Sequence, residues 1–132
     1  MQSYVIVAIL GYMIGSIPFS YLVGKKSTHL DLRQHGSGNI GATNVIRLAG
    51  KKAGILAFAL DLIKGILSYW VGFFIMGIPG AAIACGFAIL GHSYSIFMKF
   101  KGGKGVATTF GVIFSFNPVM ALLMFFFASS FF

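Results

Sequence analysis

The chain has 132 residues, of which 58% are hydrophobic and only 9% are charged. Soluble domains are about 25% charged, so the composition excludes an ordinary soluble fold and a disordered chain, and it indicates a single domain whose solvent is lipid. Ten Lys and Arg stand against two Asp and Glu, so any water-facing surface should attract anions. Cys85 is the only cysteine, which excludes a disulfide framework and a cysteine-based metal site.

The first 24 residues carry no charge and predict an apolar helix over approximately 4–24. Residues 5–23 would span about 28 Å as a helix, enough to cross the hydrocarbon of a bilayer. A signal peptide is the alternative, but residues 1–4 lack its basic start. Gly11 and Gly15 have the GxxxG spacing of a close-packing face, although glycine pairs also occur in membrane helices without that role.

Basic loops and uncharged turns divide the rest of the chain into four more apolar segments, which makes five in all. These four cover approximately 53–76, 80–98, 105–116 and 118–132. The fourth of the five, 105–116, is short. Asn117 and Pro118 predict a break between the last two segments, and the alternative is one helix kinked at Pro118. Asp61 and Lys64 interrupt the second segment three residues apart, so we expect them to pair and to face the bundle interior.

Nine of the ten basic residues fall in two loops, 25–52 and 99–104. The positive-inside rule makes both loops cytoplasmic and the N-terminus external. The prediction is an all-α integral membrane protein, a polytopic bundle of about five segments. The fifth segment has only 15 residues, about 22 Å of helix, so we expect it to be cut short and the chain to be a fragment of a longer protein.

The first loop carries Gly36, Gly38 and Gly41 in the pattern G-x-G-x-x-G. A dinucleotide-binding unit is rejected because that motif must follow a buried strand, and residues 31–35 are polar. Glycines can turn several N–H groups toward one anion, and a short helix predicted over 42–49 would add its N-terminal potential and the polar face of Thr43, Asn44 and Arg47. The alternative is a flexible basic connector that touches anionic lipid headgroups.

The second loop has glycines, a lysine and nearby hydroxyls, but it is not a Walker P-loop, because Gly105 follows Lys104 where Ser or Thr should stand. Neither loop has the carboxylates that a nucleotide–Mg²⁺ complex needs. We therefore predict that a bare phosphate or a phosphate ester binds there, without a metal or a cofactor. His92 is a candidate general base, or else it bonds a backbone carbonyl.

Several stretches together resemble one known family, the bacterial acyl-phosphate:glycerol-3-phosphate acyltransferases of the PlsY type. These stretches are 15–18 (GSIP), 31–33 (DLR), 36–47 (GSGNIGATNVIR), 50–54 (GKKAG), 61–65 (DLIKG), 91–92 (GH) and 100–108 (FKGGKGVAT). The resemblance implies a multi-pass enzyme of the bacterial inner membrane. It would transfer a fatty acyl group from acyl phosphate to the 1-hydroxyl of glycerol 3-phosphate, giving lysophosphatidic acid and phosphate in phospholipid biosynthesis.

By this resemblance Ser37, Arg47 and Lys104 are the expected catalytic residues. Arg47 and Lys104 would bind phosphate, Ser37 and Asn39 would bond the acyl-phosphate end, and the glycine turn at 102–105 would hold the departing phosphate. The expected substrate-binding residues are Gly36, Gly38, Asn39, Gly41, Thr43, Asn44, Lys64, His92, Gly102, Gly103, Gly105 and Thr108. The family's third motif, near its C-terminus, has no counterpart in this chain, which leaves the chain's own activity open.

The expected partners are acyl phosphate, glycerol 3-phosphate and membrane lipids, with no nucleic acid and with the chain as a monomer. Two other functions stay open at this point. One is an anion or phosphate transporter, because broken helices and basic loops also serve that function. The other is an inactive, truncated membrane fragment.

Overall fold

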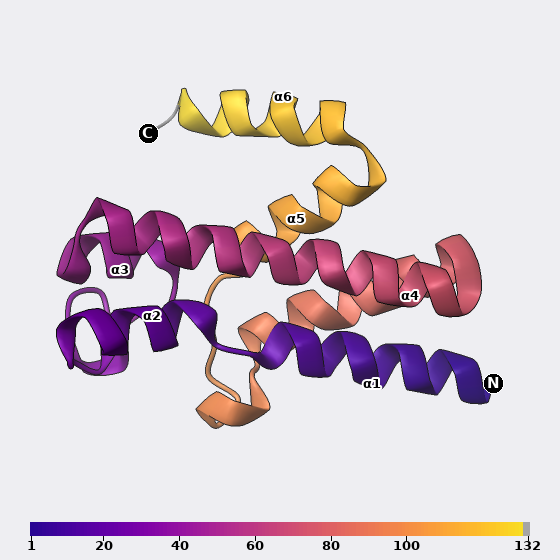
Figure 1. Cartoon of the computed structure of the whole chain (residues 1–132), viewed down its shortest axis with the longest axis horizontal. Coiled ribbons are helices and arrows are strands. Elements are labelled where there is room, and N and C mark those ends of the chain that lie inside the picture. Colours follow the sequence, from indigo (N-terminus) through magenta and orange to yellow (C-terminus); the bar gives the residue numbers. More distant parts are fainter. Residues whose placement is uncertain (131–132) are drawn as a thin grey trace.

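The computed structural model describes residues 1–130, and every regular element in that range is helical (Figure 1). In chain order the elements are α1 (Gln2–Ser16), α2 (Phe19–Thr28), η1 (Leu32–Gln34), α3 (Ala42–Ala49), α4 (Lys51–Ser93), η2 (Ile96–Met98), α5 (Val106–Phe116) and α6 (Pro118–Ser129). Because residues 1–130 contain no strand, the rejection of a dinucleotide-binding unit is confirmed. The short helix predicted over 42–49 is α3.

The prediction of one helix over 4–24 is wrong, because the backbone leaves the helix at Ile17 and Pro18. Ile17 is extended, with φ −62° and ψ 114°, as expected for a residue that precedes proline. The helix resumes at Phe19 and continues to Thr28, past the predicted end. The first apolar segment is therefore two helices with a break on the side nearer the first loop.

α4 consists of two antiparallel arms, 51–75 and 78–93, joined by a sharp turn (Figure 1). The turn is at Met76 and Gly77, and Gly77 has φ +67° and ψ −151°, a conformation open to glycine. Pro79 follows in the first turn of the second arm, where the missing N–H costs no hydrogen bond. Within the predicted segment 80–98, α4 itself ends at Ser93, and residues 94–98 form a turn with η2.

The break predicted before Pro118 is confirmed. Asn117 is extended, with φ −155° and ψ 98°, and its side chain accepts hydrogen bonds from the N–H groups of Val119 and Met120. Pro118 takes the first position of α6, so N-capping and proline together end α5 and start α6.

Small residues bring the helices together. An added Cβ at Gly11 would lie 2.8 Å from Cα of Ala84, and one at Gly15 would lie 2.6 Å from Cα of Ala88. The predicted close-packing face of α1 is therefore confirmed, and it packs on the second arm of α4. Gly65 similarly packs the first arm against the backbone of α5.

The large apolar side chains, in contrast, lie on the outside. Phe74, Phe126 and Phe127 are 79%, 66% and 69% exposed, whereas the buried positions of α4 are mostly Gly, Ala, Ser and Asp61 with Lys64. An interior of small and polar residues under an apolar exterior is the arrangement that lipid favours. By length and composition, Gln2–Thr28 and Lys51–Met98 could cross a membrane, while α5 and α6 are shorter.

Candidate functional site

Asn44 organises the first loop from a buried position on α3. Its Nδ2 donates to the carbonyl oxygens of Leu32 (3.1 Å), His35 (3.1 Å) and Asn39 (2.8 Å). Its Oδ1 accepts from the N–H of Ser37 at 3.1 Å. The whole amide is engaged within the loop, so the structure gives Asn44 a part in shaping the loop rather than in contacting a substrate.

The glycines of this loop adopt only part of the predicted geometry. Gly36 and Gly38 have φ of +59° and +75°, which favours glycine, whereas Gly41 is extended with φ −87°. The N–H of Gly38 donates to His35 O at 3.0 Å, and that of Gly41 to Asn39 Oδ1 at 2.8 Å. The prediction of free glycine N–H groups is therefore wrong at Gly38 and Gly41. The donors left for an anion are the N–H of Gly36, the first-turn N–H groups of α3 and nearby side chains.

Arg47 lies over the glycine turn, with its Cδ 3.4 Å from the position of a Cβ at Gly36. Arg47, Thr43 and Ser37 are all exposed. The Ser37 hydroxyl accepts only a long 3.4 Å bond from the N–H of Asn39. Arg47 makes no hydrogen bond or ion pair within residues 1–130, so its guanidinium is available to an anion.

Arg33, in contrast, is already neutralised by Asp31. The guanidinium donates to both carboxylate oxygens, at 3.0 Å to Oδ1 and 2.8 Å to Oδ2. These hydrogen bonds lower the pKa of Asp31 from 3.8 to about 2 and raise the pKa of Arg33. The pair stiffens the start of the loop, and Arg33 is not a free cation.

In the second loop two glycine N–H groups close the end of α4. Gly102 donates to the carbonyl of Ser93 at 2.9 Å, and Gly103 donates to that of His92 at 3.2 Å. The prediction that the N–H groups of this turn hold a phosphate is thus wrong at Gly102 and Gly103. Gly105, with φ +78°, is the N-cap of α5. The donors left in this loop are its own N–H, the first turn of that helix and the exposed Lys104.

The first loop and η2, which directly precedes the second loop, pack on one buried apolar cluster. Its core is Tyr21, Leu32, Ile40, Val45, Ala57 and Met98. Leu32 and Ile40 come from the first loop, and Met98 is 4% exposed in the segment that leads into the second. Both loops lie toward the end of the molecule opposite the N-terminus and the turns at 77 and 117 (Figure 1).

This end carries a strong positive charge. The chain's two acidic residues are already paired, Asp31 with Arg33 and Asp61 with Lys64. The other cations are exposed and have no carboxylate partner within residues 1–130; they are Lys25, Lys26, Arg47, Lys51, Lys52, Lys99, Lys101 and Lys104. An uncompensated cluster of this kind attracts anionic ligands.

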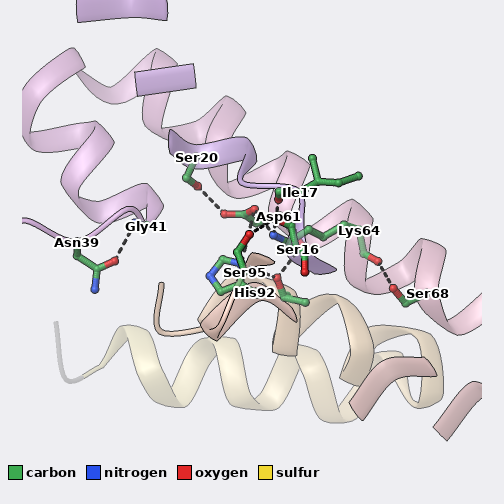
Figure 2. Close-up of polar contacts among 11 residues, drawn as sticks. Ser16, Ile17, Ser20, Asn39, Gly41, Asp61, Lys64, Ser68, His92 and Ser95 are labelled. Atoms are coloured by element: carbon green, nitrogen blue, oxygen red, sulfur yellow. Dashed lines mark hydrogen bonds and ion pairs between the residues drawn. The ribbon is translucent and has the colours of Figure 1, made fainter. Parts of the chain in front are cut away.

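A buried polar cluster lies beneath the loops, centred on Asp61 (Figure 2). Lys64 Nζ is 3.1 Å from Asp61 Oδ1, and both side chains are 2% exposed, so the predicted inward-facing pair is confirmed. Ser20 donates to Asp61 Oδ2 at 2.5 Å. Lys64 donates to the carbonyl of Ile17 at 2.9 Å, so it stabilises the break after α1 instead of reaching the exposed loops.

His92 connects this buried cluster with the second loop. Its Nδ1 is 3.3 Å from Oγ1 of Thr108, and that hydroxyl donates to the carbonyl of Asp61 at 3.2 Å. Its Nε2 would lie 2.6 Å from a Cβ at Gly103. His92 and Thr108 are both buried, so they support the second loop from below.

Sequence reasoning missed three serines in the cluster, Ser16, Ser20 and Ser95. Ser95 donates to the carbonyl of Ser16 at 2.5 Å. With the bond from Lys64 to Ile17 O, it is the second side chain that donates to a carbonyl at the end of α1. The available signal was Pro18, because a helix break in an apolar setting leaves carbonyl groups that need donors. Hydroxyl residues on either side of that proline were the candidates.

Comparisons with known proteins agree with the fold. A family model described as glycerol-3-phosphate acyltransferase matches residues 5–132. Curated proteins of that name from Thermoanaerobacter sp. (strain X514) and Bacillus subtilis (strain 168) are 44% and 47% identical, over 90% and 88% of this chain and 60% of each relative. The chain spans about three fifths of the length of these relatives.

Two solved structures are similar throughout most of the chain. They are crystal structures of PlsY (YgiH), described as an integral membrane glycerol 3-phosphate acyltransferase, in a glycerol 3-phosphate form and a lysophosphatidic acid form. The TM-scores are 0.86 and 0.83 at 43% and 40% identity, and each match covers 94% of this chain and 62% of the other. With the family model matching nearly every residue, the chain belongs to the glycerol-3-phosphate acyltransferase family and has its all-α integral membrane fold.

Proposed function

We propose that this protein transfers a fatty acyl group from acyl phosphate to the 1-hydroxyl of glycerol 3-phosphate, forming lysophosphatidic acid and phosphate. The relatives named above carry the acyltransferase name, and the two PlsY structures are described as glycerol 3-phosphate and lysophosphatidic acid forms. These ligands fit a basic, phosphate-binding face at the edge of an apolar bundle.

The observation that carries this proposal is the apolar cluster shared by the first loop and η2, which leads into the second loop. Arg47 lies over the glycine turn of the first loop, and Lys104 is exposed in the second. Both reactants carry phosphate, and two such anions brought close together repel each other by several kcal/mol at intermediate dielectric. Arg47, Lys104 and the first-turn N–H groups of α3 and α5 would offset that repulsion and align the hydroxyl with the acyl carbonyl. Ser37 and the free Nδ2 of Asn39 would hold the acyl-phosphate end.

The reaction needs no metal or cofactor. The 1-oxygen of glycerol 3-phosphate attacks the acyl carbon, the bond from that carbon to the phosphate oxygen breaks, and phosphate leaves with the bonding electrons. Because phosphate is a good leaving group, the attack needs no strong base. His92 is buried beneath the loop, so the hydroxyl proton passes to a substrate phosphate oxygen instead.

The test uses membranes from cells that express the gene for this chain, with palmitoyl phosphate and radiolabelled glycerol 3-phosphate. Wild-type membranes should form labelled lysophosphatidic acid only when palmitoyl phosphate is present. Arg47→Ala or Lys104→Ala should lower the rate at least tenfold, about 1.4 kcal/mol of barrier, while Lys26→Ala, an exposed cation of the same face, should change it far less. A variant that keeps the wild-type rate would remove that residue from the site, and formation of product without acyl phosphate would overturn the proposed donor.

We also propose that the protein is a monomer in the bacterial inner membrane, crossing it several times with its N-terminus outside and both basic loops in the cytoplasm. The concentration of unpaired cations at one end supports this orientation. Single cysteines placed at Lys26 and Ile78, in a Cys85→Ala background, should react with a membrane-impermeant maleimide from opposite sides of a sealed vesicle. Labelling of both from the same side would contradict this topology.

A further inference from the structure

A small cavity lies inside the buried polar cluster, beside the break between α1 and α2. Its lining includes Ser16, Ser20, Asp61, Lys64, His92 and Ser95, and the space open to the centre of a water-sized sphere is about 10 Å³. Two polar atoms of this lining have no hydrogen-bond partner within residues 1–130, Ser16 Oγ and Asp61 Oδ1. Their side chains are 0% and 1% exposed, and both residues line this cavity (labelled in Figure 2).

Of the two atoms, the carboxylate oxygen has the greater need for a hydrogen-bond donor, because it is charged and buried. Asp61 Oδ2 receives the hydroxyl of Ser20. Oδ1 has one charged neighbour, the ammonium of Lys64 at 3.1 Å, which also donates to Ile17 O. His92 Nδ1 is 3.9 Å from Oδ1, beyond hydrogen-bond range. A carboxylate oxygen has more than one acceptor position, and Asp61 Oδ1 is buried with no well-directed hydrogen bond within residues 1–130. A further donor would replace stabilisation that its water shell would have given.

Charge and size together define what fits. The carboxylate repels an anion, and the ammonium of Lys64, 3.1 Å from the same oxygen, repels a cation. The group must be neutral, must donate to Asp61 Oδ1, and must exchange a hydrogen bond with Ser16 Oγ. A space of about 10–15 Å³ by this measure holds one water molecule.

We propose that one ordered water occupies this cavity, donating to Asp61 Oδ1 and bonding Ser16 Oγ. Lys64 and Ser95 already donate to the backbone at the end of α1. The water adds a link through a side chain of α1 to the carboxylate of α4, so three separate contacts hold the helix break in place. This assignment is independent of the acyltransferase activity.

The test is a crystal structure of the protein in a lipid mesophase at a resolution that reveals ordered water. A peak within about 2.7–3.2 Å of both Ser16 Oγ and Asp61 Oδ1 is expected. Ser16→Ala should lose this peak, and Ser20→Ala, which removes a direct donor to the same carboxylate, should keep it. The proposal fails if the wild-type protein has no peak, if Ser16 Oγ bonds a protein group directly, or if the peak persists in Ser16→Ala.

Discussion

The close contact between α1 and the second arm of α4 gives a sharp stability test at Gly15. In Gly15→Ala the new Cβ would lie 2.6 Å from Cα of Ala88, and the carbonyl oxygen of Ala88 is closer still, where ordinary contacts begin near 3.4 Å. The helices must therefore separate locally by more than about 0.8 Å. Gly86, in the second arm of α4 itself, has no atom within 4 Å of its Cβ position. Gly86→Ala is therefore a matched control that adds the same methyl group in open space.

The two substitutions should change the free energy of unfolding in opposite directions. Overpacking a tight contact costs about 1–3 kcal/mol, and alanine in place of glycine returns at most about 1 kcal/mol of helix propensity. Gly15→Ala should therefore lose about 1–2 kcal/mol, with little propensity gain so close to the end of α1. Gly86→Ala should gain up to about 1 kcal/mol.

The assay is SDS-driven unfolding of each purified variant in mixed micelles, followed by the helical circular dichroism signal. The two variants should differ by about 2 kcal/mol. If Gly15→Ala is as stable as Gly86→Ala, the helices do not meet at this glycine, and the packing of α1 on α4 described above is wrong.

Other predictions follow from the polar contacts. Lys64→Met should lower the free energy of unfolding by about 3 kcal/mol or more, because it leaves Asp61 buried and unpaired; adding Asp61→Asn should recover most of that loss in the same unfolding assay. The pKa of Asp31 is about 2 in the folded protein against an ordinary 3.8, so its ion pair stabilises the loop above pH 3.8 and this contribution is lost as the pH falls through 2. Its carboxyl carbon should titrate near 2 by NMR, and Arg33→Ala should move the midpoint toward the ordinary value. Asn44→Ala should cost about 1–3 kcal/mol and speed amide exchange in the first loop, because it leaves several loop groups unpaired; unchanged exchange would contradict its organising role.

Much of the helical framework could be predicted from local chemistry. Asn117 and Pro118 form an N-cap and a first helical position, so neighbouring residues alone determine that break. Gly11 and Gly15 lie on one face through their spacing, and Asp61 must face inward with Lys64 because lipid excludes both charges.

The hydrogen bonding of the glycine loops was not predictable in the same way. The N–H groups of Gly102 and Gly103 bond carbonyls at the end of α4, and that of Ser37 bonds the side chain of Asn44 on the next helix. A glycine-rich stretch shows that the backbone can bend, but tertiary partners decide where its amides point. The interruption at Ile17 was missed for a related reason, since hydropathy measures how apolar a stretch is and not whether its peptide bonds stay helical.

The donors at that interruption come from much later in the chain. Lys64 and Ser95 supply the hydrogen bonds to Ile17 and Ser16, 47 and 79 residues further along. Neither donor has been synthesised when the first segment leaves the ribosome, so its bare peptide carbonyls would face the insertion machinery or the bilayer alone. We expect this segment to enter the membrane as a continuous helix and to acquire its bend only after the later segments have followed it in, which makes biogenesis of this bundle dependent on the order of translation.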